Sequence, residues 1–267
     1  MSDLSVTLIQ SSLHWEDTDA NLKIFDEKID SIKEKTEIVM LPEMFSTGFS
    51  MHPEILAETM DGKTIQWMRA TASKKKIILT GSIIIEENGQ YFNRLIWMLP
   101  NGQFAFYDKR HLFAYAEEHQ HYTAGNKKLM AQVKGWKIYP VICYDLRFPV
   151  WLRQPPEEEE RYDLLICVAN WPASRSDAWD VLLRSRAIEN QCFVAGINRS
   201  STDGNHIYYN GRSAIVDPEG KVIIRKDKDE SMIQYTLQKD TITDTRKRFP
   251  FLQDADHFTI QLKSWTK

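Results

Sequence analysis

Short, continuous apolar segments recur along the chain and are separated by polar segments that contain glycine, proline or asparagine. Runs of this kind, rich in branched side chains, are typical of strands that are buried on both faces. The pattern predicts strands over 4–9, 38–41, 77–85, 93–99, 104–107, 136–143, 164–168, 193–197, 211–216 and 221–224. Asn88-Gly89 predicts a hairpin turn between the third and fourth of these strands.

Other segments carry apolar residues at spacings of three and four, which is the period of a helix with one apolar face. The apolar positions are Leu22, Phe25, Ile29 and Ile32, then Ile65, Met68 and Ala72, then Trp179, Leu182, Leu183 and Ala187. Thr18 and Asp19 are candidate caps for the first helix. Strands and helices thus alternate in the outer parts of the chain, with hairpins inside. This order indicates an α/β or α+β layered fold.

The chain has 267 residues and nothing that resembles a linker, so we expect a single domain over 1–267. Apolar residues make up 42% and charged residues 27%, and the net charge is −3. This balance gives no reason to expect nucleic acid or an anionic membrane as a partner. No apolar run approaches the roughly 20 residues that cross a bilayer, and the N-terminus does not resemble a signal peptide.

The chain has three cysteines, Cys143, Cys167 and Cys192, and they show no metal-ligand spacing. Cys167 and Cys192 lie within apolar runs and are expected in the core. Odd, unpaired cysteines suit a reducing compartment, and we therefore predict a cytoplasmic protein.

Three chemically active residues each follow an apolar, strand-like run. Glu43 comes after Leu41-Pro42, Lys109 after Tyr107-Asp108, and Cys143 after Val141-Ile142. A thiol at the end of a strand is well placed as a nucleophile, and the backbone amide of Tyr144 could meet an oxyanion there.

A cysteine–histidine hydrolase is an alternative, because His111, His119 and His121 cluster in the sequence. This cluster lacks an Asn or Asp at the spacing expected of an orienting residue. We therefore interpret the three histidines as pocket or loop residues.

Glu43, Lys109 and Cys143 occur in the order and settings of the nitrilase, or carbon–nitrogen hydrolase, superfamily, which this chain resembles over nearly its whole length. Cys143-Tyr-Asp-Leu-Arg-Phe-Pro149, followed by Ala169-Asn-Trp-Pro172, resembles the omega-amidase branch. The resemblance implies a four-layer α-β-β-α sandwich, in which helices flank two stacked mixed sheets. It also implies at least a homodimer that pairs through its helices, with the tail (about 249–267) at the subunit interface.

The resemblance also implies roles for the active residues. Glu43 would be the general base, Lys109 would favour the thiolate and stabilise an oxyanion, and Cys143 would form a thioester acyl-enzyme. A second catalytic glutamate is best matched by Glu118, with Glu117 as its rival. No metal or organic cofactor is implied.

Further residues that lie just beyond strand ends are candidates for the substrate pocket. These are Tyr144, Asn170, Trp171 and Arg175, with Tyr115 at the mouth. Arg175 is the candidate for binding a substrate carboxylate. Arg147 is instead expected to be a structural partner of Asp145.

The leading hypothesis is hydrolysis of the terminal amide of small dicarboxylic acid monoamides. By resemblance the compounds are 2-oxoglutaramate and 2-oxosuccinamate, which would give ammonia and the 2-oxo acid. An amidase acting on deaminated glutathione is the alternative within the same chemistry. A catalytically silent scaffold is the alternative from another class.

Overall fold

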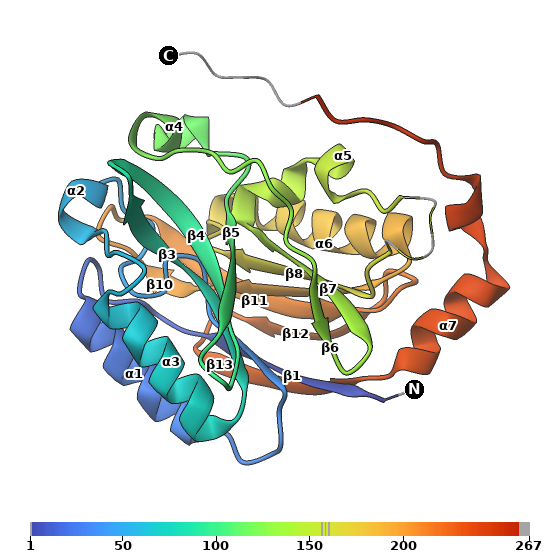
Figure 1. Ribbon diagram of the computed structural model, residues 1–267, viewed down its shortest axis with the longest axis horizontal. Coiled ribbons are helices and arrows are strands. Elements are labelled where there is room, and N and C mark those ends of the chain that lie inside the picture. Colours follow the sequence, from blue (N-terminus) through green and yellow to red (C-terminus); the bar gives the residue numbers. More distant parts are fainter. Residues whose placement is uncertain (1, 156, 158, 160, 262–267) are drawn as a thin grey trace.

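Two β-sheets lie face to face with helices outside them in the computed structural model, which describes residues 2–261 except 156, 158 and 160 (Figure 1). The six-stranded sheet has the order β13-β1-β2-β3-β4-β5. Its strands are β1 (Leu4–Gln10), β2 (Ile38–Met40), β3 (Ile78–Glu87), β4 (Gln90–Met98), β5 (Phe104–Asp108) and β13 (Ser231–Leu237). Strands β1, β2 and β3 are parallel, and the other pairs are antiparallel.

The second sheet has seven strands in the order β10-β11-β9-β8-β7-β6, with β12 paired to β11. Its strands are β6 (Ala131–Val133), β7 (Trp136–Ile142), β8 (Leu164–Ala169), β9 (Phe193–Asn198), β10 (Ser200–Thr202), β11 (Tyr208–Val216) and β12 (Val222–Asp227). Strands β7, β8 and β9 are parallel. Both sheets are therefore mixed, as the resemblance implied.

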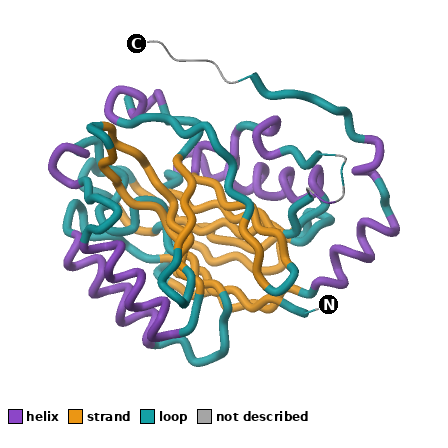
Figure 2. Tube along the Cα trace, viewed as in Figure 1, coloured by secondary structure: helices purple, strands orange, loops and turns teal. Residues whose placement is uncertain are grey.

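Helices cover the two outer faces (Figure 2). On the first sheet lie α1 (Thr18–Asp30) and α3 (Lys63–Lys75), and on the second lie α5 (Pro149–Leu152) and α6 (Ser176–Asn190). The predicted caps of the first helix were wrong by one residue or more. Asp17 is its N-cap, because its carboxylate accepts a hydrogen bond from the amide of Ala20 at 3.0 Å.

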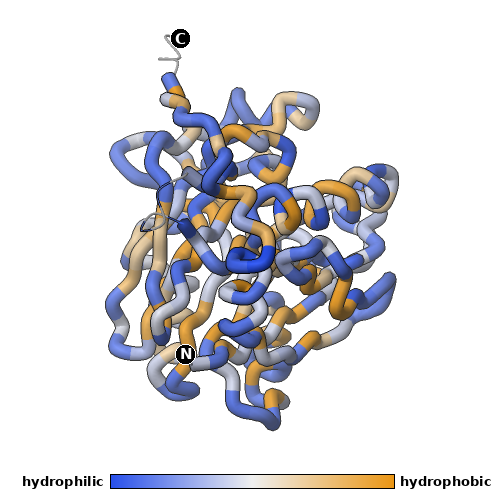
Figure 3. Tube along the Cα trace, turned by 90° about the vertical axis from the view of Figure 1, so that its right-hand side faces the viewer, coloured by the Kyte–Doolittle hydropathy of each residue, from blue (hydrophilic) through white to orange (hydrophobic). Residues whose placement is uncertain are grey.

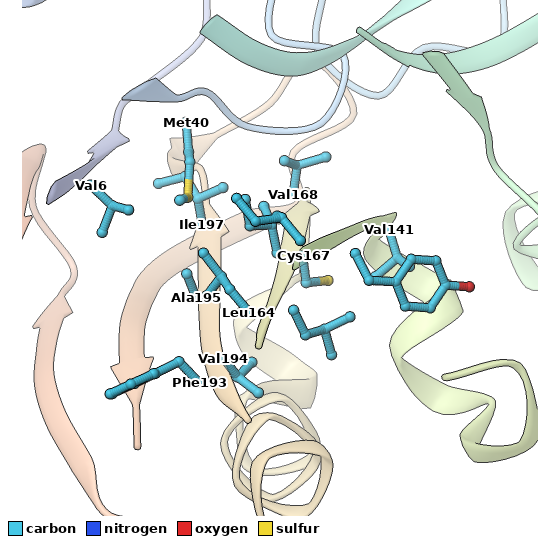
Figure 4. Close-up of a cluster of buried hydrophobic side chains, with 14 of the residues drawn as sticks. Val6, Met40, Val141, Leu164, Cys167, Val168, Phe193, Val194, Ala195 and Ile197 are labelled. Atoms are coloured by element: carbon cyan, nitrogen blue, oxygen red, sulfur yellow. The ribbon is translucent and has the colours of Figure 1, made fainter. Parts of the chain in front are cut away.

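The core has two layers, and β2 contributes to both. Ile38 and Met40 pack between the sheets, whereas Val39 and Leu41 pack under α1 and α3. Figure 4 shows Met40 pointing from the first sheet toward Ile197 of the second. Along the trace, hydrophobic positions recur through the strands, and the outer loops are largely hydrophilic (Figure 3). A strand that is buried on both faces has a continuous run of apolar residues, and this is why the sequence pattern predicted β2.

The hairpin between β3 and β4 forms as predicted. Asn88 and Gly89 have φ values of 54° and 73°. Both φ angles are positive, and a two-residue turn needs positive φ angles to match the twist of the two strands.

Several elements were not predicted. They are β6, β10, β13, the helix α7 (Lys239–Arg248), and the short helices α2 (Pro53–Leu56) and α4 (Glu118–His121). Most of these elements are short or largely polar, and β13 mixes polar with apolar residues, so none of them forms a continuous apolar run. In the tail, a 3₁₀ turn spans Phe251–Asp254, and residues 262–267 lie outside the described part. No helix of the described part is both long enough and apolar enough to cross a membrane.

Candidate active site

Cys143 begins a sharp turn directly after β7, one residue beyond the end of the strand. It is the first residue of a 3₁₀ helix, Cys143–Arg147, and its φ is +43°. This left-handed conformation is costly for a residue with a side chain, and such strain is held at functional sites by the surrounding structure. The Asp145 carboxylate closes the turn by accepting the amide of Ile142 at 3.2 Å.

Asp145 also ties this turn to the segment that carries Lys109. Its carboxylate accepts the Tyr107 hydroxyl at 2.8 Å and the backbone amide of His111 at 2.9 Å, and it lies 2.8 Å from His111 Nδ1. The His111 ring also stacks on Phe148. The fold thus supplies an acidic partner for His111 that the sequence spacing did not reveal, and it uses the pair to join two loops.

Glu43, Lys109 and Glu118 form one buried cluster. Lys109 Nζ lies 2.8 Å from Glu43 Oε1 and 2.9 Å from each oxygen of Glu118. All three side chains are at most 1% exposed. Two carboxylates therefore share a single ammonium in a region without bulk water.

The rival glutamates differ clearly in their surroundings. Glu118 is buried, and its Oε2 also accepts the amide of Phe113 at 2.5 Å. Glu117 is exposed and has a φ of +59° at the junction of a 3₁₀ turn with α4. The structure therefore brings Glu118, and not Glu117, to Lys109.

The electrostatics of the cluster keep the lysine charged and the thiol protonated. Burial alone would lower the pKa of Lys109, but Glu118 and Glu43 outweigh it and raise that pKa. Burial, and then the Glu43 charge, raise the pKa of the Cys143 thiol well above its usual range, and Lys109 opposes them by less. Burial also raises the pKa of Glu118 despite Lys109. Lys109 acts on the thiol in the expected direction, because its charge lowers the pKa of Cys143, but burial and the Glu43 charge have the larger effect.

A cavity of about 140 Å³ lies against this cluster. Lys109, Cys143, Tyr144, Arg147 and Arg175 are among the residues that line it. The remaining lining residues are Phe49, Met51, Phe113, Ala116, Asn170, Trp171, Pro172, Asp203, Asn205, Ile207 and Tyr209. One small cavity thus joins a thiol, an ammonium and two cations.

A model of the carbon-nitrogen hydrolase family matches residues 5–247. The chain belongs to the carbon–nitrogen hydrolase family. It is 41% identical to the omega-amidase YafV of Escherichia coli (strain K12) over 261 residues, which are 97% of this chain and all of that protein. It is 30% identical to the 2-oxoglutaramate amidase of Bacillus subtilis over 94% of this chain and 96% of that protein. The predicted resemblance to the omega-amidase branch is thereby confirmed.

Solved structures of carbon–nitrogen hydrolases share the fold. XC1258 of Xanthomonas campestris, described as a CN-hydrolase superfamily protein with an arsenic adduct in the active site, superposes with a TM-score of 0.95 at 40% identity. The match covers 98% of this chain and all of that one. Nit3 of Saccharomyces cerevisiae, a member of branch 10 of the nitrilase superfamily, gives 0.84 at 27% identity, with 93% and 94% covered. The four-layer fold and an amide-hydrolysing enzyme, rather than a silent scaffold, are confirmed for this carbon–nitrogen hydrolase.

The pocket of this carbon–nitrogen hydrolase differs from the sequence-based expectation at Arg147. This residue does not pair with Asp145, whose carboxylate is occupied by the turn and by the Lys109 segment. Its guanidinium instead lies 4.8 Å from the centre of the Trp171 ring, at the cavity wall. A guanidinium readily stacks on an aromatic face, and this contact turns Arg147 toward the cavity.

Tyr115 is 85% exposed and is not among the residues that line the cavity, although the Arg175 guanidinium, which does line it, lies 6.0 Å from the Tyr115 ring centre. Phe113 lines the cavity instead, with the Arg175 guanidinium 5.1 Å from its ring centre. Aromatic residues at 113 and 115 share the same segment, and only the fold decides which of them faces inward.

Asn170 lines the cavity as predicted, but its hydrogen bonds point to Glu43. Its backbone amide donates to Glu43 Oε2 at 2.8 Å, and its side-chain amide donates to the Glu43 carbonyl at 2.7 Å. Asn93 of β4 was missed altogether, although its side chain donates to Glu43 Oε1 at 2.8 Å. A fully buried amide within an apolar strand was the signal that could have revealed it.

Within the described part of the chain, no group of three or more His, Cys, Asp or Glu side chains is arranged to hold a metal ion. In the acidic pair of the cluster, Lys109 Nζ lies within 2.9 Å of both carboxylates.

Proposed function

We propose that this enzyme hydrolyses the terminal amide of small dicarboxylic acid monoamides, such as 2-oxoglutaramate and 2-oxosuccinamate, to ammonia and the 2-oxo acid. The observation that carries the proposal is that Cys143, Lys109, Arg147 and Arg175 all line one small cavity. The names of the relatives, an omega-amidase and a 2-oxoglutaramate amidase, support the same substrate class.

In the first step the Cys143 sulfur attacks the amide carbon, and Glu43 accepts the thiol proton as the carbon–sulfur bond forms. A thiol that is protonated at rest needs such a base at the moment of attack. Lys109 and the amide of Tyr144 stabilise the oxyanion of the tetrahedral intermediate. Glu43 then gives the proton to the nitrogen, the carbon–nitrogen bond breaks, and ammonia leaves.

In the second step water attacks the thioester carbon, and Glu43 accepts a proton from this water. The carbon–sulfur bond breaks, the proton returns to the sulfur of Cys143, and the dicarboxylic acid leaves. Glu118 keeps Lys109 in place through both steps, because it contacts Nζ with both of its oxygens.

Arg147 and Arg175 bind the carboxylate at the far end of the substrate. Each guanidinium is oriented by an aromatic ring, Trp171 for Arg147 and Phe113 for Arg175. An oriented guanidinium can donate two parallel hydrogen bonds to a carboxylate. A substrate with an amide at one end and a carboxylate at the other therefore suits this cavity.

The size of the cavity favours small monoamides over deaminated glutathione. Its volume of about 140 Å³ is below the range of roughly 300–1,000 Å³ that is usual for sites of drug-sized ligands. A compound built from three amino-acid units would extend beyond this space, whereas a four- or five-carbon acid amide fits within it.

We also propose a homodimer that forms through the outer face of α5 and α6, in the cytoplasm. Val181 and Ile188 of α6 are 61% and 51% exposed, and Val150 of α5 is 55% exposed. Exposed apolar side chains gathered on one face are typical of an interface. The three cysteines are free thiols, which suits a reducing compartment.

Ammonia release from a panel of amides tests the proposed reaction. We expect turnover of 2-oxoglutaramate, 2-oxosuccinamate and succinamate, and much weaker turnover of butyramide, which lacks the carboxylate, and of glutamine, whose ammonium would face two arginines. Cys143→Ala should release no ammonia while circular dichroism shows an intact fold. A folded wild-type enzyme that releases ammonia from none of these amides, or an active Cys143→Ala variant, would overturn the proposal.

A further inference from the structure

Asn93 lies at the centre of the buried cluster and contacts each of its charged members. Its side-chain nitrogen donates to Glu43 Oε1 at 2.8 Å and lies 3.3 Å from Glu118 Oε1. Its backbone carbonyl accepts the amide of Lys109 at 3.0 Å. The residue is fully buried in β4. Within the described part of the chain, only the side chains of Asn93 and Lys109 donate hydrogen bonds to both glutamates.

The charges explain why a neutral donor is needed there. Two carboxylates and one ammonium leave a net negative charge in a region without water, and like charges at short range repel strongly when they are buried. An amide N–H stabilises both carboxylates without adding a formal charge. A second lysine would neutralise the cluster and weaken Glu43 as a base, and an aspartate would add a third negative charge.

The orientation of the Asn93 amide is set by the two glutamates. Its Oδ1 is buried without a hydrogen-bond partner in the described structure. The unpaired oxygen is costly, but this orientation lets the N–H groups of the amide point at both carboxylates. The opposite arrangement would point an oxygen at two anions.

The hydrogen bonds to Glu43 show which of its two carboxylate oxygens can still accept another hydrogen bond. Oε1 accepts from Asn93 and Lys109, and Oε2 accepts from the backbone amide of Asn170. Because each carboxylate oxygen accepts about two hydrogen bonds, one acceptor position on Oε2 is left for a proton from Cys143.

We infer that Asn93 is a positioning residue for the reaction. Its amide holds Glu43 so that one acceptor position of Oε2 stays open, and it keeps the two glutamates from turning away from Lys109. This inference rests on the proposed role of Glu43 as the general base. Asn93 itself touches neither substrate nor the reacting atoms.

Asn93→Leu tests this role, because leucine has a similar size and no donor. Removing a donor from a carboxylate makes its protonated form easier to reach, so the acid limb of the kcat/KM profile should move to higher pH by about one unit. We expect kcat to fall while KM changes little. Asn93→Ala, which leaves room for a water, provides the second measurement if the leucine variant does not fold.

Asn190→Leu is the matched control. Asn190 is also a fully buried asparagine with hydrogen bonds to the backbone, but it lies at the end of α6 among structural contacts. This variant should lose stability without moving the acid limb. The inference would be overturned if Asn190→Leu shifted the acid limb of the kcat/KM profile by the same amount. It would also be overturned if folded Asn93 variants left that acid limb at the wild-type pH.

The rate at which iodoacetamide alkylates Cys143, followed by mass spectrometry across pH, separates this inference from the proposed function. Alkylation needs no amide substrate, so it reports the thiol and its base even if no amide of the panel is hydrolysed. The pH dependence of alkylation should move to higher pH in the Asn93 variants and stay unchanged in Asn190→Leu. An unmoved alkylation profile in folded Asn93 variants would contradict the role of Asn93.

Discussion

Two adjacent glutamates, Glu117 and Glu118, differ in everything except their chemistry. The left-handed backbone at Glu117 turns its side chain outward, and the next residue points inward to Lys109. A charged group that is buried and paired cannot be altered without leaving its partner unpaired, whereas an exposed one usually can.

We expect Glu118→Gln to lower kcat by about 10²-fold, because the neutral amide no longer balances Lys109 and frees it to move away from the reacting oxygen. Steady-state ammonia release at pH 7 measures this change. Glu117→Gln is the matched control and should keep wild-type kcat. Equal effects of the two substitutions would contradict the assignment of Glu118 to the site.

At the scale of elements, the active residues lie beyond the carboxyl ends of strands from both sheets. Cys143 follows β7 and Asn170 follows β8, which are parallel neighbours, and Glu43 follows β2 of the other sheet. The ends of parallel strands meet at one edge of a sheet, and ligands commonly bind there. Stacking the two sheets brings these edges together, so each sheet supplies part of the cluster.

The segment between β12 and β13 shows how the elements are held in place. The Glu230 carboxylate accepts the backbone amide of Ser12 at 2.8 Å, just beyond β1, and lies 2.9 Å from Lys28 Nζ of α1. Burial opposes ionisation, but the hydrogen bonds from Ser12 and Lys28 outweigh it and lower the pKa of Glu230 to about 2. This glutamate therefore joins a strand, a helix and a turn.

Glu230→Gln should reduce the free energy of unfolding at pH 7 by about 1 kcal/mol or less, because the group is largely exposed and the interaction is screened by water. The folded-state pKa lies below the ordinary value of 4.5, so the stabilisation is present above pH 4.5 and is lost as the pH falls toward 2. Urea unfolding at pH 7 and pH 3 should show a smaller difference between variant and wild type at pH 3. A gap that widens on acidification would contradict this account.

At the scale of the whole molecule, the outer helices of the two sheets present different surfaces. Val181 and Ile188 lie seven residues apart, two turns of α6, and so share one face. Helix α5 lies beside α6 (Figure 1), and two residues after α5 the backbone amide of Gln154 donates to the side chain of Asn190 at the end of α6. This face is the proposed dimer interface.

The double substitution of Val181 and Ile188 to Asp should convert the dimer to a monomer, because it places two charges in an apolar contact. Light scattering coupled to size exclusion should then show half the wild-type mass. Ile55→Asp on α2 is the control, since Ile55 is also exposed and lies far from α6 (Figure 1). A wild type that is already monomeric, or a dimer that survives the double substitution, would contradict the proposed interface.

The sequence by itself predicted the layered class of the fold and singled out Glu43 and Lys109, which meet in the cluster, and Cys143, which lines the cavity. Buried strands such as β2 and β8 are continuous apolar runs, and Glu43, Lys109 and Cys143 each end such a run in a pattern that resembles the family. These signals are local, because the burial of a strand and the position of its end can be predicted from residues that are neighbours in the sequence. Elements such as β13, which mixes polar and apolar residues, and α7, which is largely polar, are not continuous apolar runs and carry no such signal.

Only the tertiary structure decided which of several equivalent side chains faces the site. It placed Glu118 rather than Glu117 at Lys109, Phe113 in the lining of the cavity, and Arg147 at the cavity rather than at Asp145. It also brought Asn93 to Glu43, 50 residues away in sequence. The physical reason is that side-chain direction depends on backbone angles and on partners from distant strands, and neither is encoded in a local pattern of apolar and polar residues.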